Sequence, residues 1–441
     1  MPNSALPRLD QIAASVAGYD PNALPVAQAR EFITRLVPQV QAVEWLAIRS
    51  ALGRVLARDV VSAIDVPAHD NSAMDGYALR SADLLAGADT LISVAGTGFA
   101  GANFSAAVGP GQGLRIMTGA VLPAGLDTVV PQEFTQIEPD GRVRIPAGTV
   151  RAGDNRRLRG EDLACAETAL QAGRILGPAD LGLLASLGQA EVAVYRRLRV
   201  AFFSTGDELR SVGEPLAAGD VYDSNRYTLW AMLTRLGVEV IDLGVVRDDP
   251  AALRTAFSQA AACADAVITS GGVSVGEADH TKQVMKALGE VLFWKIAMRP
   301  GRPMAIGRIG EMGGTGGVGG AANPPAMLFG LPGNPVAVMV TFYAFVRQAL
   351  LAMSGATPQP LPLLRAVSEA ALRKKPGRTE YQRGILSVAA DGRQTVRITG
   401  SQGSGILRSM SEANGMVVLH HGQGDVAAGE LVDVVPFDGL I

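Results

Sequence analysis

The sequence predicts a multidomain protein of the α/β plus β class, built around a three-layer α/β/α domain with a mainly parallel sheet. From residue 198 onward, continuous apolar runs alternate with helical patterns, which is typical of such a domain. On either side, short apolar runs are separated by Gly, Pro and Asp, which favours small β-domains and a small barrel. The 441 residues also exceed what one hydrophobic core holds, so several domains are expected.

Three parts follow from these patterns. We expect mixed helix and β-domains at residues 1–197, the α/β domain at 198–356, and a small C-terminal β-barrel at 361–441. Residues 310–326 are almost entirely Gly, Ala and Pro, and they predict a flexible insertion between two strands of the α/β domain.

The N-terminal part combines helical and β patterns. Pro25 stands where a helix would begin. The patterns predict helices at 26–36, 43–52 and 176–187, a strand at 54–66, a turn-rich segment at 67–77 and a β-domain at 90–150.

The α/β domain is expected to alternate strand and helix throughout. Its predicted strands lie at 198–203, 238–246, 265–269 and 291–297, with a last one beginning at 327 that leads into a helix ending near 354. Its other predicted helices lie at 226–236, 250–263 and 281–288.

Composition excludes several classes of protein. The net charge of −3 argues against bulk electrostatic binding to nucleic acid or to an anionic membrane. Cys165 and Cys263 stand far apart without a CxxC pattern, which suits a reducing compartment. The first residues show no signal peptide, and the apolar stretch 335–353 predicts a buried helix. We expect a cytoplasmic protein without membrane or nucleic-acid partners.

Four polar loops follow predicted strands of the α/β domain, at 204–208, 247–249, 270–279 and 295–302. Ligands of such domains bind beyond the carboxyl ends of the strands, so four polar loops at one edge predict a binding site.

The loop after residue 269 has two interpretations. Gly271 and Gly272 remove Cβ atoms where backbone must come close to something, and the turn precedes a helix, which favours an anion such as phosphate. Glu277 and Asp279 would repel a bare phosphate, which indicates a divalent cation between them. A tight turn with a solvated acidic cap explains the same residues equally well.

Lys295 follows Trp294 in an apolar strand, where an unpaired charge is costly. Its side chain either extends past Trp294 to water or binds an anion at the strand end. We favour the anion, because Arg299 and Arg302 follow directly and Pro300–Gly301 turns the chain there.

The motifs taken together resemble the molybdopterin molybdenumtransferase family, which includes the C-terminal part of gephyrin. Each motif is short, but ten of them occur in one order across about residues 25 to 435. They read DNSAMDGYA (70–78), RIMTGA (115–120), RGED (159–162), STGDEL (204–209), RDD (247–249), SGGVSVGEAD (270–279), FWKIAMRPGRP (293–303), LPGNP (331–335), PGRTEYQRG (376–384) and SQGS (401–404).

The resemblance implies insertion of molybdate into adenylylated molybdopterin, with release of AMP, a Mg²⁺ ion and an elongated homodimer. Asp75 and Thr118 are then expected to face the α/β domain of the partner subunit. The implied catalytic residues are Asp248, Asp279, Glu208, Asp75, Thr118 and Lys295, and the implied metal ligands are Asp248 and Asp279. The implied substrate-binding residues are Thr205, Gly206, Asn225, Ser270, Gly271, Gly272, Pro332, Pro335, Asp162, Arg299, Arg383 and Ser404.

Among these residues, Lys295, Arg299, Arg383 and Ser404 supply the positive charge and neutral donors that a tetrahedral dianion such as molybdate requires. Arg299 and Arg302 stand where lysine is common in the family, which changes the donor geometry. Two other functions are kept in view: a molybdopterin adenylyltransferase, and a gephyrin-like scaffold. The sequence leaves open whether molybdenum or tungsten is preferred and which subunit supplies which half of the site.

Overall fold

A computed structural model describes residues 8–273, 280–310 and 324–437, and the chain divides into two compact units. Unit 1 comprises Met1–Glu44, Gly53–Val55 and Tyr195–Ile441, and unit 2 comprises Trp45–Leu52 and Leu56–Val194. Each unit has hydrophobic clusters of its own.

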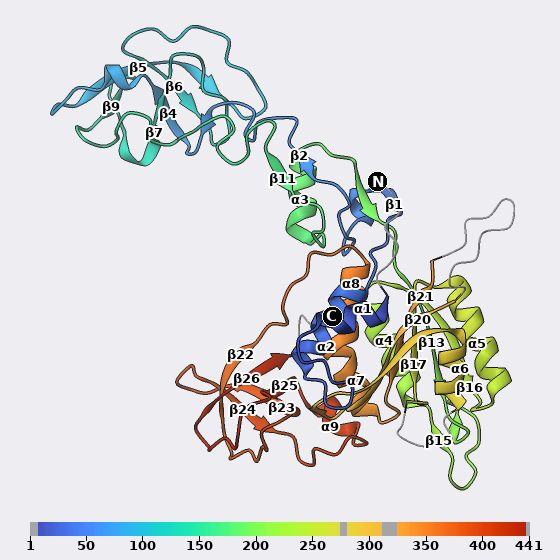
Figure 1. Cartoon of the computed structure of the whole chain (residues 1–441). Helices are drawn as coiled ribbons and strands as arrows, with labels where there is room; N and C mark the ends of the chain where they lie inside the picture. Colours follow the sequence, from blue (N-terminus) through green and yellow to red (C-terminus); the bar gives the residue numbers. More distant parts are fainter. Residues whose placement is uncertain (1–7, 274–279, 311–323, 438–441) are drawn as a thin grey trace, which may run out of the picture. The chain divides into compact units, whose positions relative to one another are not determined.

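A six-stranded sheet forms the centre of unit 1 (Figure 1). Its strands are parallel except β20, which is antiparallel to both neighbours, so β18 again runs in the common direction. The predicted mainly parallel sheet is therefore confirmed. Across the sheet the order is β16 (Glu239–Val246), β13 (Arg199–Thr205), β17 (Ala266–Ser270), β21 (Ala326–Leu331), β20 (Pro303–Ile309) and β18 (Gly289–Lys295).

Helices cover both faces of this sheet, which confirms the three predicted layers. Alternate strand residues divide between the faces: Phe202 joins one cluster and Phe203 the other. The first face carries α2 (Val26–Leu36), α4 (Ser224–Arg235) and the helix Pro335–Met353, with α1 (Leu9–Ser15) at its margin. The second face carries α5 (Pro250–Cys263) and α6 (His280–Leu288).

The helix Pro335–Met353 is the one described helix long and apolar enough to cross a membrane, with a mean hydropathy of 1.7, yet 72% of it is buried inside the protein. It thus packs as a core helix, as predicted. It consists of α7 (Pro335–Thr341), a π-helical segment at Phe342–Val346 and α8 (Arg347–Met353). Arg30 Nε of α2 donates to Ala344 O in the π segment at 2.9 Å.

The C-terminal strands close into a five-stranded barrel, because β23 pairs with both β24 and β25. The predicted barrel is confirmed. A short strand between β18 and β20 joins it, since Arg299 lies opposite Glu380. The strands are β19 (Met298–Arg299), β22 (Leu364–Ser368), β23 (Thr379–Val388), β24 (Gln394–Ile398), β25 (Gly415–Leu419) and β26 (Leu431–Pro436), with α9 (Arg408–Glu412) between β24 and β25.

Unit 2 is built on a second six-stranded sheet, in the order β7 (Thr128–Pro131), β4 (Gly76–Leu79), β6 (Gln112–Ile116), β5 (Thr90–Gly98), β9 (Val143–Ile145) and β8 (Gln136–Ile137). Short pairs join β2 (Val60–Val61) to β11 (Thr168–Leu170), β3 (Asn71–Ser72) to β10 (Arg156–Arg157) and β1 (Val43–Ala47) to β12 (Glu191–Tyr195). The predicted helix near residue 180 is α3 (Pro178–Ser186).

Two predicted elements are wrong. The expected helix at 43–52 is β1 followed by a single 3-10 turn at Ile48–Ser50, because pairing with a distant strand overrides the local helical spacing. The expected strand at 54–66 contains only Val60–Val61. Asp59 and Asp65 flank it, and their carboxylates accept backbone N–H groups of distant loops at 2.8 Å, which holds the chain in turns.

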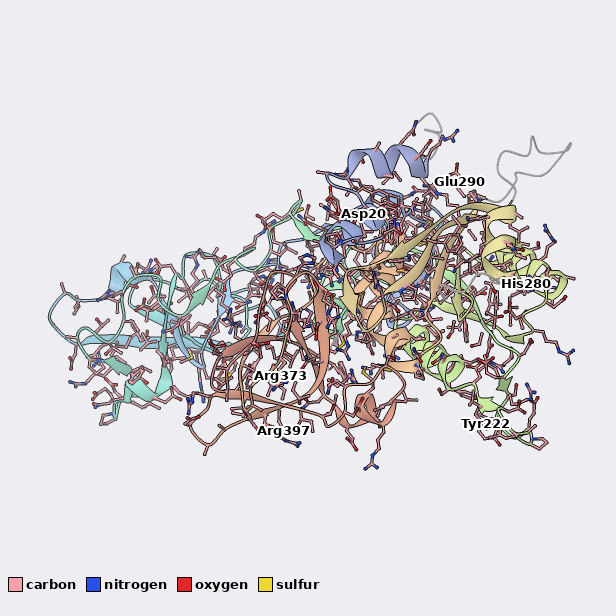
Figure 2. All side chains as sticks on the ribbon, turned by 60° about the horizontal axis from the view of Figure 1, so that its bottom comes forward. Asp20, Tyr222, His280, Glu290, Arg373 and Arg397 are labelled. Atoms are coloured by element: carbon pink, nitrogen blue, oxygen red, sulfur yellow. The ribbon has the colours of Figure 1, made fainter. Side chains whose placement is uncertain are left out.

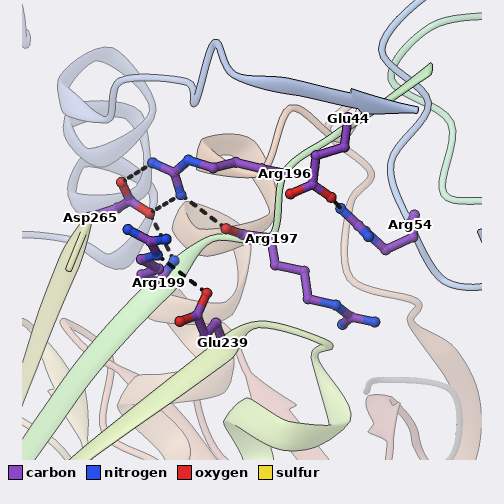
Figure 3. A network of polar contacts seen from close by, with 7 residues as sticks. All are labelled: Glu44, Arg54, Arg196, Arg197, Arg199, Glu239 and Asp265. Carbon is purple, nitrogen blue, oxygen red and sulfur yellow. Dashed lines mark hydrogen bonds and ion pairs between the residues drawn. The ribbon is translucent and has the colours of Figure 1, made fainter. Parts of the chain in front are cut away.

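A polar network anchors the start of the central sheet (Figure 3). Asp265 precedes β17 and accepts hydrogen bonds from both terminal nitrogens of Arg196, at 2.6 and 2.8 Å, and from the backbone N–H of Arg199 at 2.8 Å. The Asp265 carboxylate raises the pKa of the Arg196 guanidinium. Arg54 completes the network through Glu44 and Tyr195 O, both at 2.8 Å.

We expect Asp265→Ala to lower the free energy of unfolding by about 2 kcal/mol, because it removes the carboxylate partner of the partly buried Arg196 guanidinium and leaves the backbone N–H of Arg199 unpaired. Urea denaturation checks this value. The control is Glu239→Ala, whose ion pair with Arg199 is half exposed on both sides and is expected to contribute less than about 1 kcal/mol. Equal losses for the two variants would contradict an anchoring role for Asp265.

Candidate functional site

A cavity of about 1080 Å³ opens at the carboxyl edge of the central sheet. Loops after β13, β16, β17 and β21 contribute to it, together with the segment before β20 and the barrel loop around Gly403. Twelve of the residues predicted from the sequence line it: Thr205, Gly206, Glu208, Asn225, Asp248, Ser270, Gly271, Gly272, Arg299, Pro332, Pro335 and Ser404.

Gly271 and Gly272 shape the middle of this edge. Both have positive φ, of 95° and 66°. A Cβ atom on Gly271 would lie 2.5 Å from the backbone O of Thr205, and one on Gly272 would lie 2.5 Å from Thr281 Oγ1. The predicted close approach of backbone is therefore present, and its partners are neighbouring segments of the same unit.

Asn225 ties three loops together at the cavity wall. Its Nδ2 donates to Ser270 Oγ at 2.8 Å and to Gly333 O at 2.7 Å. These bonds hold the end of β17 and the loop after β21 against the start of α4. Asn225 thus positions the wall as well as lining the cavity.

The acidic side of the cavity contains Glu208 and Asp248, after β13 and β16. Asp248 Oδ1 accepts from Thr281 Oγ1 at 3.3 Å, and Asp248 N–H donates to Asp207 Oδ1 at 3.3 Å. Over residues 8–273, 280–310 and 324–437, no group of three His, Cys, Asp or Glu side chains could hold a metal ion. Asp279 lies outside the described residues, so the Mg²⁺ site remains a prediction.

The basic side contains Arg299, whose exposed guanidinium has no ion-pair partner in the described part of the chain. Arg383 is fully buried nearby and does not line the cavity. Its Nε donates to Ser409 Oγ at 3.0 Å, and its Nη2 donates to Ser401 O at 3.3 Å and Gly403 O at 3.0 Å. Burial, and then the charge of Arg299, lower the pKa of Arg383 to about 10. Arg383 therefore holds the loop that forms this wall.

Lys295 does not line the cavity either. It ends β18, which is five strands from β16, or about 24 Å at the usual strand spacing. Trp294 packs into the core cluster beside α2, so the exposed Lys295 side chain emerges on the other face of the sheet. The strand-end loops with Glu208 and Asp248 thus meet at one cavity, as predicted, whereas Lys295 does not line that cavity.

The remaining predicted residues, Asp75, Thr118 and Asp162, belong to unit 2. The backbone N–H and the Oγ1 of Thr118 both donate to Asp75 Oδ1 at 2.7 Å. The backbone bond first, and then the hydroxyl bond, hold the pKa of the Asp75 carboxyl below its ordinary value of 3.8. The Asp162 side chain is exposed, and its backbone N–H donates to Val66 O at 3.0 Å.

We expect Thr118→Val to raise the pKa of Asp75 toward its ordinary value, because the hydroxyl donor is lost while the backbone donor remains. Because folding lowers the pKa of Asp75, the Asp75–Thr118 pair stabilises unit 2 at pH values above the ordinary pKa of the carboxyl. This contribution is lost as the pH falls through the lowered pKa. Carboxylate NMR titration measures the shift. Thr135→Val, at a half-buried threonine of unit 2 whose hydroxyl donates to Gln132 O, should leave the Asp75 titration unchanged.

Sequence reasoning missed other lining residues, among them Tyr222 and Asp223. Tyr222 ends β15 (Val221–Tyr222), which pairs with β14 (Leu209–Arg210), and is labelled in Figure 2. Asp223 is the N-cap of α4, and its side chain accepts from the backbone N–H of Arg226 at 3.1 Å. The capping pattern Asp-Ser-Asn before the helix was the available signal, since α4 begins two residues before the predicted start.

Three family descriptions match the chain in succession. Residues 24–188 match the "MoeA N-terminal region (domain I and II)", residues 201–352 match a "Probable molybdopterin binding domain", and residues 365–437 match the "MoeA C-terminal region (domain IV)".

Whole-chain relatives agree with these matches. A protein named Molybdopterin molybdenumtransferase from Haemophilus influenzae is 41% identical over 419 residues, covering 95% of this chain and 100% of the relative. One of the same name from Nostoc sp. is 37% identical over 419 residues, covering 93% of each. The crystal structure of the molybdopterin biosynthesis moeA protein from Pyrococcus horikoshii OT3 has a TM-score of 0.79 at 26% identity, covering 94% of this chain and 100% of that one. The chain is therefore an enzyme of the molybdopterin molybdenumtransferase family.

Proposed function

We propose that this enzyme inserts molybdate into adenylylated molybdopterin, releasing AMP and leaving the molybdenum cofactor. The observation that carries the proposal is one cavity with an acidic side and a guanidinium side. Asp248 follows β16 of the central sheet, whereas Arg299 belongs to β19, which pairs with barrel strand β23, so the two charges come from different parts of the cavity wall. The cavity volume of about 1080 Å³ suits a substrate in which a nucleotide and a pterin are joined end to end.

The basic side is suited to the oxyanion. Arg299 supplies a guanidinium fork, and Ser404 supplies a neutral hydroxyl on the loop held by Arg383. Molybdate and tungstate share charge and shape, so this pairing accepts either. Lys295 does not line this cavity, so its part in binding the oxyanion stays a prediction.

The acidic side is suited to the nucleotide linkage. Thr205, Gly206 and Ser270 to Gly272 form the wall beside Glu208 and Asp248. Mg²⁺ binds through one or two carboxylates plus waters and phosphate oxygens, so Asp248, with Asp279, would hold it. When bound, it would neutralise charge on the phosphate linkage. The Thr281 hydroxyl orients the Asp248 carboxylate for this role.

We further propose a cytoplasmic homodimer in which Asp75, Thr118 and Asp162 of one subunit serve the cavity of the other. Support comes from the exposed Asp75 carboxylate and Thr118, which form a preorganised pair in unit 2. Mixing a Thr118 variant with an Asp248 variant tests this arrangement. Recovery of activity in mixed dimers is the expected result.

Asp248→Ala is expected to lower turnover at least about a hundredfold, because an essential carboxylate is removed from the phosphate side. AMP release and cofactor formation are measured together from adenylylated molybdopterin and molybdate. Thermal unfolding should change little, since Asp248 is only half-buried and its carboxylate accepts one long hydrogen bond, at 3.3 Å. The control is Asp391→Ala, an exposed carboxylate on a barrel hairpin. Unchanged turnover would remove Asp248 from the site, and transfer of AMP to molybdopterin would indicate an adenylyltransferase instead.

A further inference from the structure

The cavity wall at the start of α4 contains buried polar atoms without partners. Asp223 Oδ2 and Asn225 Oδ1 belong to residues that line the cavity, and Ser204 Oγ, at the end of β13, is a third such atom on the same face of the sheet. The Ser204 hydroxyl lies close enough to the Asp223 carboxylate to act as its donor, so of these three oxygens Asn225 Oδ1 alone has no candidate partner among the described residues and requires explanation. A partner for Asn225 Oδ1, and any further donor to the Asp223 carboxylate, has to come from the cavity.

Asp223 is the most unusual of the three. It is only 2% exposed, and no ion pair reaches it within the described residues. The nearest candidate cation, Arg226, is bound to Asp242 at 2.8 Å. Burial raises the pKa of the Asp223 carboxyl, although hydrogen bonds from the Ser204 hydroxyl and the Arg226 backbone lower it by less. Ser or Asn would cap α4 as well as Asp does, so capping alone does not explain a buried carboxyl here.

The wall presents hydrogen-bond acceptors. The amide nitrogen of Asn225 is used by Ser270 and Gly333, which leaves its Oδ1 as an acceptor. An ionised carboxylate also only accepts. A ligand group that satisfies this wall must therefore carry adjacent N–H donors, in contrast to the oxyanion expected at Arg299.

Two further features describe that group. The unpaired oxygens have almost no accessible area, so they can be reached only by a thin group entering edge-on or after a small side-chain rotation. The half-exposed ring of Tyr222 lines the same cavity, with its hydroxyl held by Glu214 O at 2.9 Å. An aromatic face beside an acceptor wall suits a planar heterocycle.

We propose that Asp223, together with Asn225, binds the N–H edge of the pterin ring and so sets the direction of the substrate in the cavity, an inference that rests on the proposed function. A 2-amino-4-oxopyrimidine edge carries a ring N–H next to an amino group, which matches a carboxylate with two parallel bonds. The edge of adenine instead presents an amino donor beside a ring-nitrogen acceptor, so one acceptor of the wall would stay without a hydrogen bond. Asp223 thereby distinguishes the two rings of the substrate.

The test compares binding of pterin with binding of lumazine, which has an oxo group in place of the 2-amino group. The wild-type protein is expected to bind pterin at least about tenfold more tightly in fluorescence titrations. Asp223→Asn keeps the helix cap and the shape but places an N–H₂ donor against the ligand's donors. This variant, and Asp223→Ser, are expected to reduce the preference to less than about twofold while thermal unfolding stays near that of the wild type.

Asp242→Asn is the matched control, because it removes a carboxylate that binds Arg226 and does not line the cavity. It should keep the preference for pterin. The proposal is overturned if the wild type shows no preference or no pterin binding into the millimolar range, or if both Asp223 variants keep the wild-type ratio. Turnover is measured separately. If the enzyme prefers pterin through Asp223 but releases no AMP, the proposed function is wrong while the assignment of Asp223 stands.

Discussion

Arg383→Ala is expected to reduce turnover by at least about a hundredfold and the free energy of unfolding by about 3 kcal/mol. The side chain is fully buried, and its Nε and Nη2 make three hydrogen bonds to Ser409, Ser401 and Gly403. Truncation leaves two carbonyl groups and a hydroxyl without these bonds and opens a large cavity beneath the loop. Because Gln402 to Ser404 line the cavity, the basic wall should lose its shape.

Two variants separate shape from charge at this position. Arg383→Lys keeps the charge but cannot reproduce the planar fork, so an intermediate loss of turnover is expected. Arg397→Ala removes an exposed arginine of the same barrel, labelled in Figure 2, and should change neither turnover nor stability by much. Wild-type turnover in Arg383→Ala would show that the loop does not depend on this side chain.

Gly271→Ala is expected to lower the free energy of unfolding by about 3 kcal/mol and to abolish measurable turnover. The residue has φ of 95°, where L side chains are strained, and a Cβ would lie 2.5 Å from the backbone O of Thr205. Backbone cannot move aside as a flexible side chain can, so β13 and β17 must separate at the cavity edge. Thermal and urea unfolding measure the loss.

Gly333→Ala provides the matched control for Gly271→Ala. Gly333 lines the same cavity, has no positive φ, and would place its Cβ 3.9 Å from the nearest atom, which is ordinary contact. A change of less than about 1 kcal/mol is therefore expected. Equal destabilisation by the two substitutions would mean that the strain argument for Gly271 is wrong.

Much of the site could be predicted because the carboxyl ends of parallel strands share one edge. Recognising strands from apolar runs therefore already grouped Glu208 with Asp248, and Ser270 with Pro332. The helix 250–263 was predicted, since Asp249 caps it and Pro250 begins it. Local chemistry and the geometry of parallel sheets are sufficient for such assignments.

Other predictions needed information that neighbours in sequence do not carry. Lys295 ends a strand with the right direction, but β18 lies at the far margin of the sheet, and strand order depends on long-range pairing. Arg383 stands in a matching motif, yet its guanidinium turns inward to a loop some twenty residues later. Residues 54–66 have strand-like composition, but Asp59 and Asp65 bond to distant backbone instead.

By itself the sequence determined the α/β class, the barrel and the family, because each rests on short-range periodicity and on motifs in a fixed order. Only the tertiary structure decided which charged groups face the cavity. Arg299 lines it, Arg383 is buried behind its wall, and Asp223 is buried in the wall without a cation beside it. The physical reason is that the direction of a loop side chain is set by packing and hydrogen bonds from segments far away along the chain, to which local spacing is insensitive.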